Sequence, residues 1–364
     1  MKFRCEREIL ADAVAAAGRG ATSSTGTSPV LAGVRFDVRG ETLTVTGTDL
    51  ELSVRATVPV GVEAEGAAVV PARLVADIVK ALPAGSVEVA LGTDQMIISA
   101  QRSEFSVRPL ALDDFPALGE PSIEPYVLPA NEMADALRQV VRAASNEDTR
   151  PVLTGVLLAA EEDTLKVVAT DSYRLAVRDL PQAALLASGQ RVLVPARALN
   201  EVQRLLGDAD ELRVYLGENE AVFEMGGVRI STRLIPGEYP NFKGLIPPAS
   251  QNVLTVAREA LIEALRRVRL LAQGSTPVRL TLGDGGLQLS AITTDVGEAS
   301  EHLDATYTGE AMTVAFNPDY LTAGVDAVSG DEVAITFSDP MRPAVMRGVG
   351  HEDYLYLLMP VRVP

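Results

Sequence analysis

Three aspartates that recur along the chain are the side chains best suited to acid–base or metal chemistry. Asp49, Asp171 and Asp295 occupy the same place in three similar segments. An active site normally needs one such carboxylate, whereas a turn or a cap uses one in every copy, because the short Asp side chain accepts hydrogen bonds from nearby backbone N–H groups. We therefore interpret them as turn or capping residues. The alternative is a hydrolase whose site the motifs do not reveal.

The other reactive side chains form no catalytic or metal-binding pattern. Cys5 is a single cysteine without a neighbouring His, so we expect it to be buried or neutral. His302 and His351 lack the spacing of a metal site and are expected at the surface. The GDGG segment at 283–286 has no phosphate-loop context and is typical of a hairpin turn. The sequence therefore predicts a non-enzymatic protein with no catalytic residue, no metal and no cofactor, which neither binds nor hydrolyses ATP.

Composition narrows the class of protein further. The chain has 364 residues, long enough for two or three domains, and a formal charge of −17. This charge argues against coating of nucleic acid by a basic exterior, although an acidic outside with a basic inside stays possible. Aromatic residues make up 4% and Trp is absent, so platforms for stacking single-stranded bases are scarce. The N-terminal residues do not resemble a signal peptide, and no apolar run is long enough to span a membrane, so we expect a cytoplasmic protein.

Internal repetition is the strongest organising signal. The segment at 29–56, PVLAGVRFDVRGETLTVTGTDLELSVRA, matches PVLTGVLLAAEEDTLKVVATDSYRLAVR at 151–178, and a fainter copy runs from Pro277 to Ser300. The second half of the unit repeats as well. VVPARLVADIVKAL at 69–82 matches LVPARALNEVQRLL at 193–206, with a third copy at 314–328. Pro-rich segments near 122 and 250 separate the units, so the predicted domains are 1–121, 127–248 and 252–364.

Each repeat combines helical and strand periods. The first helix of each repeat has an apolar face formed by Ile9, Leu10, Ala13, Val14 and Ala17, by Met133, Leu137, Val140, Val141 and Ala144, or by Leu261, Leu265, Val268 and Ala272. A second helix is predicted to begin at Pro71 and at Pro195, because proline suits the first helical turn. Alternating segments such as Leu43 with Val45, and the runs 87–91 and 212–216, predict strands. The fold class is α+β, with antiparallel sheets and two helices in each of three similar domains.

Basic residues gather on the predicted helices. Like charges three, four or seven positions apart share a helix face at a small energetic cost, which suggests an anionic partner; the pairs are Arg138 with Arg142, Arg266 with Arg269, Arg73 with Lys80, and Arg197 with Arg204. Ordinary solvated helix faces are the alternative. In the third repeat Asp319 and Asp326 occupy the places of Arg197 and Arg204, so its second helix should attract phosphate little.

Four motifs, together with the triplication, carry a resemblance to a known family. They are MKFRCEREIL at the start, ATDSYRLAV at 169–177, RLIPGEYPNF at 233–242 and YLLMPVRV at 356–363. With these features the chain resembles, over essentially its whole length, the bacterial sliding clamp, the beta subunit of DNA polymerase III.

The resemblance implies a non-enzymatic homodimer, joined head to tail, whose six domains form a ring around double-stranded DNA. A clamp loader ATPase would open it. Phe105, Leu270 and Leu271 would lie at the dimer interface. The basic residues that would face the DNA without reading its sequence are Arg73, Lys80, Arg138, Arg142, Arg150, Arg197, Arg204, Arg266 and Arg269.

The resemblance also implies a groove that binds short linear peptides of the DNA polymerase III alpha subunit, the clamp loader and other proteins. The matching residues are Leu153, Thr170, Ser172, Tyr173, Arg174, Leu175, Pro240, Leu245, Met341, Pro343, Leu357, Leu358, Met359, Pro360, Val361, Arg362 and Val363. Leu, Val and Pro would form an apolar slot, Met adapts to several partners, and Arg can hold a carboxylate or carbonyl. A C-terminal strand that only packs on its own domain is the alternative for 356–363, and a monomeric peptide-binding scaffold is the alternative for the whole chain.

Overall fold

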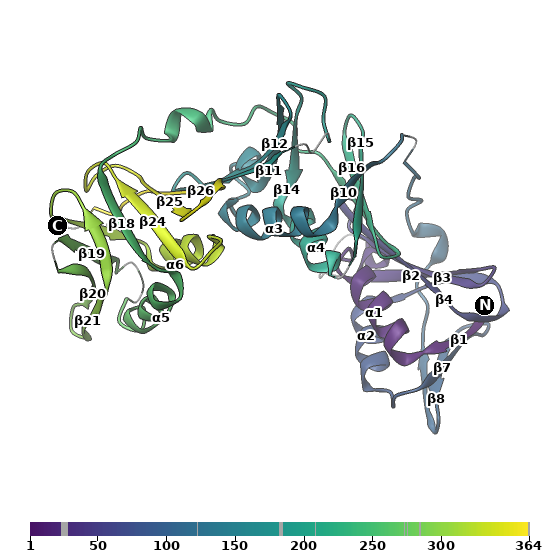
Figure 1. Ribbon diagram of the computed structural model, residues 1–364. Coiled ribbons are helices and arrows are strands. Elements are labelled where there is room, and N and C mark those ends of the chain that lie inside the picture. The colour runs from purple at the N-terminus through teal and green to yellow at the C-terminus, as the bar shows by residue number, and fades with distance from the viewer. Residues whose placement is uncertain are drawn as a thin grey trace. The chain divides into compact units, whose positions relative to one another are not determined.

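The computed structural model divides the chain into two compact units. The first contains residues 1–133 and 197–234, and the second contains residues 134–196 and 235–364. Figure 1 shows both units as sheets with helices packed beside them. The described residues are 1–22, 28–121, 123–181, 185–207, 209–272, 274, 276–283 and 285–362.

Within the described residues there are six α-helices, two for each repeat, and every pair of neighbouring strands is antiparallel. The predicted fold class, α+β with antiparallel sheets and two helices per repeat, is confirmed. All six helices are short, which agrees with the amphipathic segments read from the sequence.

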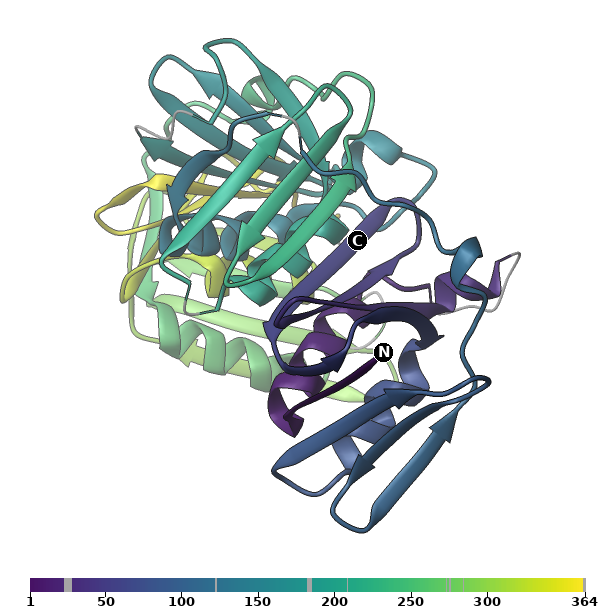
Figure 2. The ribbon, with the colours of Figure 1, turned by 90° about the vertical axis from the view of Figure 1, so that its right-hand side faces the viewer.

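The first unit contains a five-stranded sheet, β5-β1-β7-β8-β9, and an eight-stranded sheet, β10-β15-β16-β17-β4-β3-β2-β6 (Figure 2). Its strands are β1 (Lys2–Glu6), β2 (Gly33–Arg39), β3 (Thr42–Thr48), β4 (Leu52–Pro59), β5 (Gly61–Ala64), β6 (Gly66–Pro71), β7 (Ser86–Leu91), β8 (Met96–Ala100), β9 (Ser103–Val107), β10 (Tyr126–Pro129), β15 (Glu211–Leu216), β16 (Glu220–Met225) and β17 (Val228–Arg233). Its helices are α1 (Arg7–Gly18), α2 (Ala72–Ala81) and nearly all of α4 (Ala196–Leu206).

Helix α1 illustrates how the apolar period builds the core of the first unit. Leu10, Val14 and Ala17 are fully buried, as their spacing predicts. Ile9, which the sequence analysis placed on the same face, is 38% exposed, so that assignment was wrong. One helical residue rotates the side chain by about 100°, which carries Ile9 to the edge of the buried stripe defined by Leu10.

The second unit contains a nine-stranded sheet, β14-β11-β12-β13-β26-β25-β24-β18-β22, and a four-stranded sheet, β21-β20-β19-β23. Its strands are β11 (Gly155–Glu161), β12 (Thr164–Thr170), β13 (Arg174–Pro181), β14 (Arg191–Pro195), β18 (Asn252–Ala257), β19 (Val278–Gly283), β20 (Gly286–Thr293), β21 (Gly297–Leu303), β22 (Ala305–Thr308), β23 (Met312–Phe316), β24 (Glu332–Phe337), β25 (Ala344–Gly348) and β26 (His351–Leu358).

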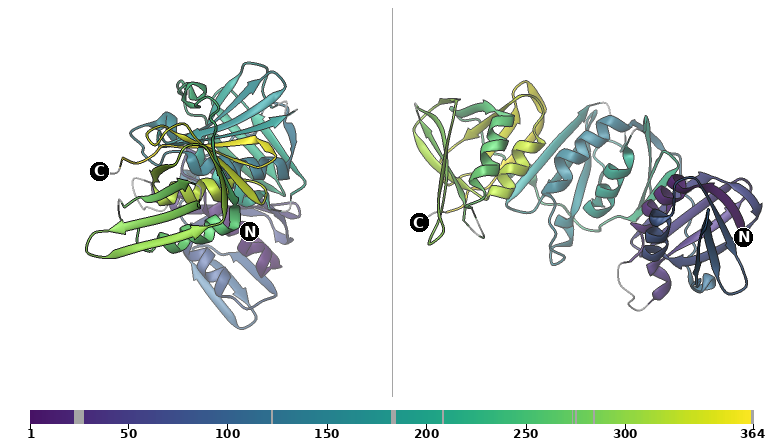
Figure 3. Two further views of the ribbon diagram at one scale, coloured as in Figure 1. Left: turned by 60° about the vertical axis from the view of Figure 1, so that its left-hand side comes forward. Right: turned by 90° about the horizontal axis from the view of Figure 1, so that it is seen from below.

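Helices α5 (Arg258–Val268) and α6 (Pro318–Ala327) belong to the second unit, as does α3 (Ala130–Val140) from Ala134 onward. Figure 3 shows α5 and α6 side by side, in green and yellow-green. The apolar faces predicted for α3 and α5 are buried along their whole length. However, α3 ends at Val140 and continues as a 3-10 turn over Val141–Ala143, so the buried stripe extends beyond the helix.

The second helices begin one residue later than predicted. Pro71 and Pro195 are the last residues of β6 and β14, and α2 and α4 begin at Ala72 and Ala196. Pro71 has φ −56° and ψ 117°, so its fixed φ suits the helix while its ψ is still extended. In the third repeat Pro318 does occupy the first helical position, after Asn317, whose side chain accepts hydrogen bonds from the N–H groups of Asp319 and Tyr320.

The two units do not coincide with the three repeats, because each large sheet joins strands of two repeats. Strand β4 of the first repeat pairs with β17 of the second, and β13 of the second pairs with β26 of the third. Each seam is a regular antiparallel ladder of five residue pairs. The domain boundaries at 1–121, 127–248 and 252–364 therefore stay a prediction from the repeat.

Candidate functional site

The repeated aspartates close turns in the first two repeats. Asp49 Oδ1 accepts hydrogen bonds from the N–H groups of Glu51 and Leu52 at 3.0 and 2.8 Å. Asp171 Oδ1 does the same for Tyr173 and Arg174 at 2.9 and 3.0 Å. Asp295 instead takes a left-handed conformation, φ 64°, in the turn between β20 and β21. The turn role is thus confirmed for all three, by side-chain capping twice and by backbone conformation once.

Asp171 also organises a polar anchor at the start of β13. Its Oδ2 lies 2.9 Å from Arg174 Nε, and the two side chains are only 9% and 12% exposed. The Arg174 guanidinium lies over the ring of Tyr320, 4.3 Å from its centroid, and Tyr173 stacks against the same ring. Charge pairing and the aromatic face together compensate the burial of the arginine. Tyr320 comes from α6, so this anchor joins the second and third repeats.

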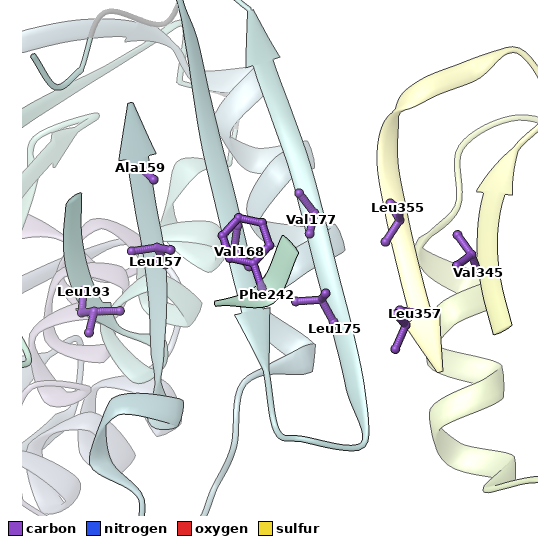
Figure 4. Packing of buried hydrophobic residues seen from close by; sticks show 10 residues of the cluster. All are labelled: Leu157, Ala159, Val168, Leu175, Val177, Leu193, Phe242, Val345, Leu355 and Leu357. Carbon is purple, nitrogen blue, oxygen red and sulfur yellow. The ribbon is translucent and has the colours of Figure 1, made fainter. Parts of the chain in front are cut away.

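An apolar cluster lies beside this anchor, over the seam between β13 and β26 (Figure 4). We call it the groove floor. It consists of Leu157, Ala159, Val168, Leu175, Val177, Leu193, Phe242, Val345, Leu355 and Leu357. Leu175 faces Leu357 and Val177 faces Leu355 across the seam. Because alternate residues of a strand point to one face, these four side chains form a continuous apolar strip.

Exposed apolar side chains stand on the segments around the floor, and we call them the groove rim. Their exposed fractions lie between 37% and 57%, and they are Tyr173, Leu245, Met341, Met359 and Val361. Leu245 ends the 3-10 turn Phe242–Leu245, whose Phe242 belongs to the floor. The chain beyond β26 is held by two backbone bonds, from Met359 N–H to the carbonyl of Tyr173 and from Val361 N–H to that of Ala315. The floor side chains are at most 9% exposed, and Val152, Ile235, Tyr239 and Ile246 pack against them, so the rim provides the apolar area that water reaches.

The other residues of the predicted groove are placed as follows. Pro240, Ser172 and Arg362 are exposed, and Pro343 and Pro360 are partly exposed. Leu153, Thr170 and Leu358 are buried. Leu358 follows Leu357 on the strand, so its side chain points to the opposite face and serves the core. The predicted residue Val363 lies outside the described part of the chain.

Several groove residues were missed by the sequence analysis. Val177 and Leu355 lie two residues from Leu175 and Leu357 on the same strands, so their side chains point to the same face, and this could have been predicted. Phe242 is the last residue of the RLIPGEYPNF motif and could have been included as well. Tyr320 and Val345 had no local signal. They reach the groove only because α6 and β25 fold against β26.

The equivalent seam in the first unit is not apolar. There Ser53 faces Ser231, where the second unit pairs Leu175 with Leu357. Arg55 faces Arg229, where the second unit pairs Val177 with Leu355. A concavity of about 790 Å³ over this seam holds Glu120, whose carboxylate contacts both arginines. Although partial burial acts in the opposite direction, hydrogen bonds from Arg229 and Arg55 lower the pKa of Glu120. The repeat thus builds the seam twice, and only the second has side chains for an apolar peptide.

Most of the basic residues predicted to face DNA are already paired with carboxylates. Arg197 pairs with Asp49, and Arg150 with Glu147. Arg138 and Arg204 lie 3.6 and 3.8 Å from acids one turn earlier, Asp135 and Glu201. Arg142 and Arg269 pair with acids of α6. Among the described residues, Arg73, Lys80 and Arg266 have no ion pair.

The reactive side chains set aside in the sequence are placed as expected. Burial, followed by the nearby Glu6 carboxylate, raises the pKa of the Cys5 thiol to about 11, which makes it a poor nucleophile. His302 and His351 are exposed. In the described part of the chain no group of three or more His, Cys, Asp or Glu could hold a metal ion. No helix among those residues is long and apolar enough to cross a membrane.

Comparison with known proteins gives this fold and groove a family. Three family models match consecutive parts of the chain: the N-terminal domain of the DNA polymerase III beta subunit at residues 1–119, its central domain at 127–241 and its C-terminal domain at 243–362. The Streptomyces coelicolor beta sliding clamp is 35% identical over the full length of both chains.

Solved structures agree with the family models. The DNA polymerase sliding clamp of Bacillus subtilis matches with a TM-score of 0.91 at 28% identity, and the sliding clamp of Bartonella birtlesii bound to griselimycin with 0.91 at 31%, each over 100% of both chains. The fold and these matches therefore define a DNA clamp. The family models and full-length relatives agree on its kind. The chain belongs to the family of bacterial DNA polymerase III beta subunits, the beta sliding clamps. It is a non-catalytic processivity subunit of DNA replication.

Proposed function

We propose that two copies of this chain close head to tail into a ring that encircles duplex DNA and tethers the replicative polymerase to it. The apolar cluster of the second unit, with the exposed apolar side chains of the rim, is the observation that supports the tethering role. It would bind short linear peptides of the DNA polymerase III alpha subunit, the clamp loader and other proteins. The clamp would act in the cytoplasm and needs no cofactor.

Edge strands and exposed apolar side chains support a head-to-tail dimer. Strand β9 is the edge of the five-stranded sheet and carries Phe105, which is 38% exposed. Strand β21 is the edge of the four-stranded sheet. Leu270 follows shortly after the end of α5 at Val268, and its side chain is 73% exposed. An unpaired strand edge is a template for pairing with another chain. Two different surfaces that join in this way form a heterologous contact. Such a contact closes into a ring only if the rotation between neighbouring copies brings the last copy back to the first.

We expect Leu270→Ala to weaken the dimer. The ring contains this contact twice, and burial of each leucine side chain contributes about 1.5–3 kcal/mol, so the dissociation constant of the dimer should rise roughly 10²- to 10⁴-fold. Analytical ultracentrifugation of the full chain measures it. Leu74→Ala on α2, where the leucine is 48% exposed, is the matched control and should leave the dimer unchanged. A wild-type protein that sediments at its chain mass of 38.5 kDa would favour the monomeric scaffold instead.

Enclosure explains how a protein of charge −17 holds DNA. Phosphate contacts carry little sequence information, and a weak, sparse set of them lets a ring slide. Topological linkage then keeps the protein on the duplex without tight binding.

This mode of binding predicts different retention on circular and linear DNA. After loading by a clamp loader, the clamp should stay on a nicked circle through gel filtration and leave the same molecule once a restriction enzyme cuts it. Blocking both ends of the linear DNA with a bulky protein should restore retention. Equal retention on open linear and circular DNA would contradict enclosure and point to ordinary surface binding.

A further inference from the structure

Helix α6 of the third repeat departs from its counterpart in a way that affects the DNA-facing residues. Asp319 and Asp326 stand at the places where α4 carries Arg197 and Arg204. The exchange changes the charge at these two places from +2 to −2. The sequence alone predicts only that α6 attracts phosphate little.

The structure shows that these acids do more, because each one pairs with an arginine outside α6. Asp326 Oδ2 lies 2.6 Å from Arg142 Nη1, in the 3-10 turn after α3. Asp319 Oδ1 lies 2.5 Å from Arg269 Nη2, directly after α5. Both arginines belong to the set predicted to face DNA. A carboxylate thus occupies the position that a backbone phosphate would take on each guanidinium.

All four side chains remain accessible. Arg142 and Asp326 are 50% and 43% exposed, and Arg269 and Asp319 are 56% and 59% exposed. Exposed pairs of this kind are weak, so an incoming phosphate can displace the carboxylate. Displacement of this carboxylate by phosphate still costs more free energy than release of a mobile counterion, because the carboxylate is tethered beside the arginine.

Helix stability favours Asp319, which lies in the first turn of α6, but it does not account for Asp326. Leu321 and Val325 of α6 are fully buried, and the helix also packs Gly324 close to the ring of Tyr356. Gln139 Nε2 of α3 donates to the carbonyl of Ala327 at 2.9 Å, so buried contacts already fix the end of α6. Asp326 lies in the last turn, where a negative charge opposes the helix dipole. An acid at that place is unfavourable for the helix and favourable only for its pairing with Arg142.

We propose that Asp319 and Asp326 act as internal competitors of DNA phosphate, which weaken the clamp's hold on the duplex so that it slides. The proposal rests on the proposed function, since it assigns a role to acids beside the DNA-facing arginines. It predicts that Arg266, which has no ion pair in the described part of the chain, contributes more to DNA affinity than Arg269 does.

The test is the affinity of the clamp dimer for a short labelled linear duplex, measured by fluorescence anisotropy between about 50 and 200 mM salt. The double variant Asp319→Asn/Asp326→Asn removes four competing pairs from the dimer and should bind roughly 4- to 900-fold more tightly than wild type. The slope of log affinity against log salt should steepen by up to about 3.6, because two more arginines in each of the two protomers become available to phosphate.

Two controls separate local pairing from a general change of charge. Asp179→Asn removes a carboxylate that pairs with Lys166 at 2.7 Å, on the sheet face that carries the groove floor, and should leave DNA affinity unchanged. Arg269→Ala should have little effect in the wild-type background and a clear one in the Asp319→Asn background.

The outcomes distinguish this proposal from the proposed function. If the clamp is retained on circles but the double variant gains no affinity, or if Asp179→Asn gains as much, the competitor role is overturned while enclosure stands. Equal effects of Arg269→Ala in both backgrounds also overturn it. Loss of retention on circles in the wild type would instead overturn the enclosure.

Discussion

Removal of residues 359–364 should abolish peptide binding and leave a folded dimer. Met359 and Val361 belong to the groove rim, and an apolar side chain buried by a bound peptide contributes about 1.5–3 kcal/mol. Loss of both should weaken binding of a polymerase-derived peptide at least about a hundredfold. Fluorescence polarisation with a labelled peptide measures this change.

The fold should survive because the described residues of this segment, 359–362, contribute no buried side chain. Their two backbone hydrogen bonds, from Met359 and Val361, lie outside the β26 ladder. Val349→Ala provides a matched control, since this valine is 48% exposed at the far end of the β25–β26 hairpin. Wild-type peptide affinity in the truncated dimer would exclude the C-terminal segment from the groove and leave it as a strand extension.

The second large effect concerns the three repeated aspartates, which should differ sharply in their cost to stability. Asp171→Ala leaves the Arg174 guanidinium, 12% exposed, without its carboxylate, so the free energy of unfolding should fall by about 3–5 kcal/mol. Asp49→Ala removes two hydrogen bonds from backbone N–H groups, and its partner Arg197 is 56% exposed, so about 1–2 kcal/mol is expected. Asp295→Ala should cost about 1 kcal/mol or less, for its left-handed φ alone.

Urea unfolding followed by circular dichroism ranks the three variants. The double variant Asp171→Ala/Arg174→Met should recover much of the lost stability, since removal of both charges leaves none unpaired in the core. Peptide affinity should fall in Asp171→Ala as well, because Tyr173 and Arg174 lose the oxygen that holds their N–H groups. Equal costs at all three positions would show that the aspartates serve only as turn residues.

Sequence and structure agree best where a pattern is local. The burial of Leu10, Val14 and Leu265 follows from a period of 3.6 residues, which depends only on neighbours along the chain. The burial predicted for Ile9 and the helix starts predicted at Pro71 and Pro195 were each wrong by one position. Such errors arise because the edge of a buried stripe and the last residue of a strand depend on what packs against them.

The groove was predicted in part for the same reason. Motifs placed Leu175, Leu357 and Met359 in it, through resemblance to a family. Tyr320 was missed, because its stacking on Arg174 and Tyr173 depends on the docking of α6, which no local period reveals.

The sequence by itself determined the threefold repeat, the antiparallel α+β class, the family resemblance and the absence of enzymatic motifs, because these are properties of spacing along one chain. Only the tertiary structure decided how the repeats join. Seams between β4 and β17 and between β13 and β26 bring together residues more than 150 positions apart, and there the choice of Ser and Arg or of Leu and Val separates a charged seam from an apolar groove. It also decided that Asp319 and Asp326 face Arg269 and Arg142. Charge can be counted in a sequence, but which charges neutralise one another depends on distances of a few ångströms between elements remote in the chain.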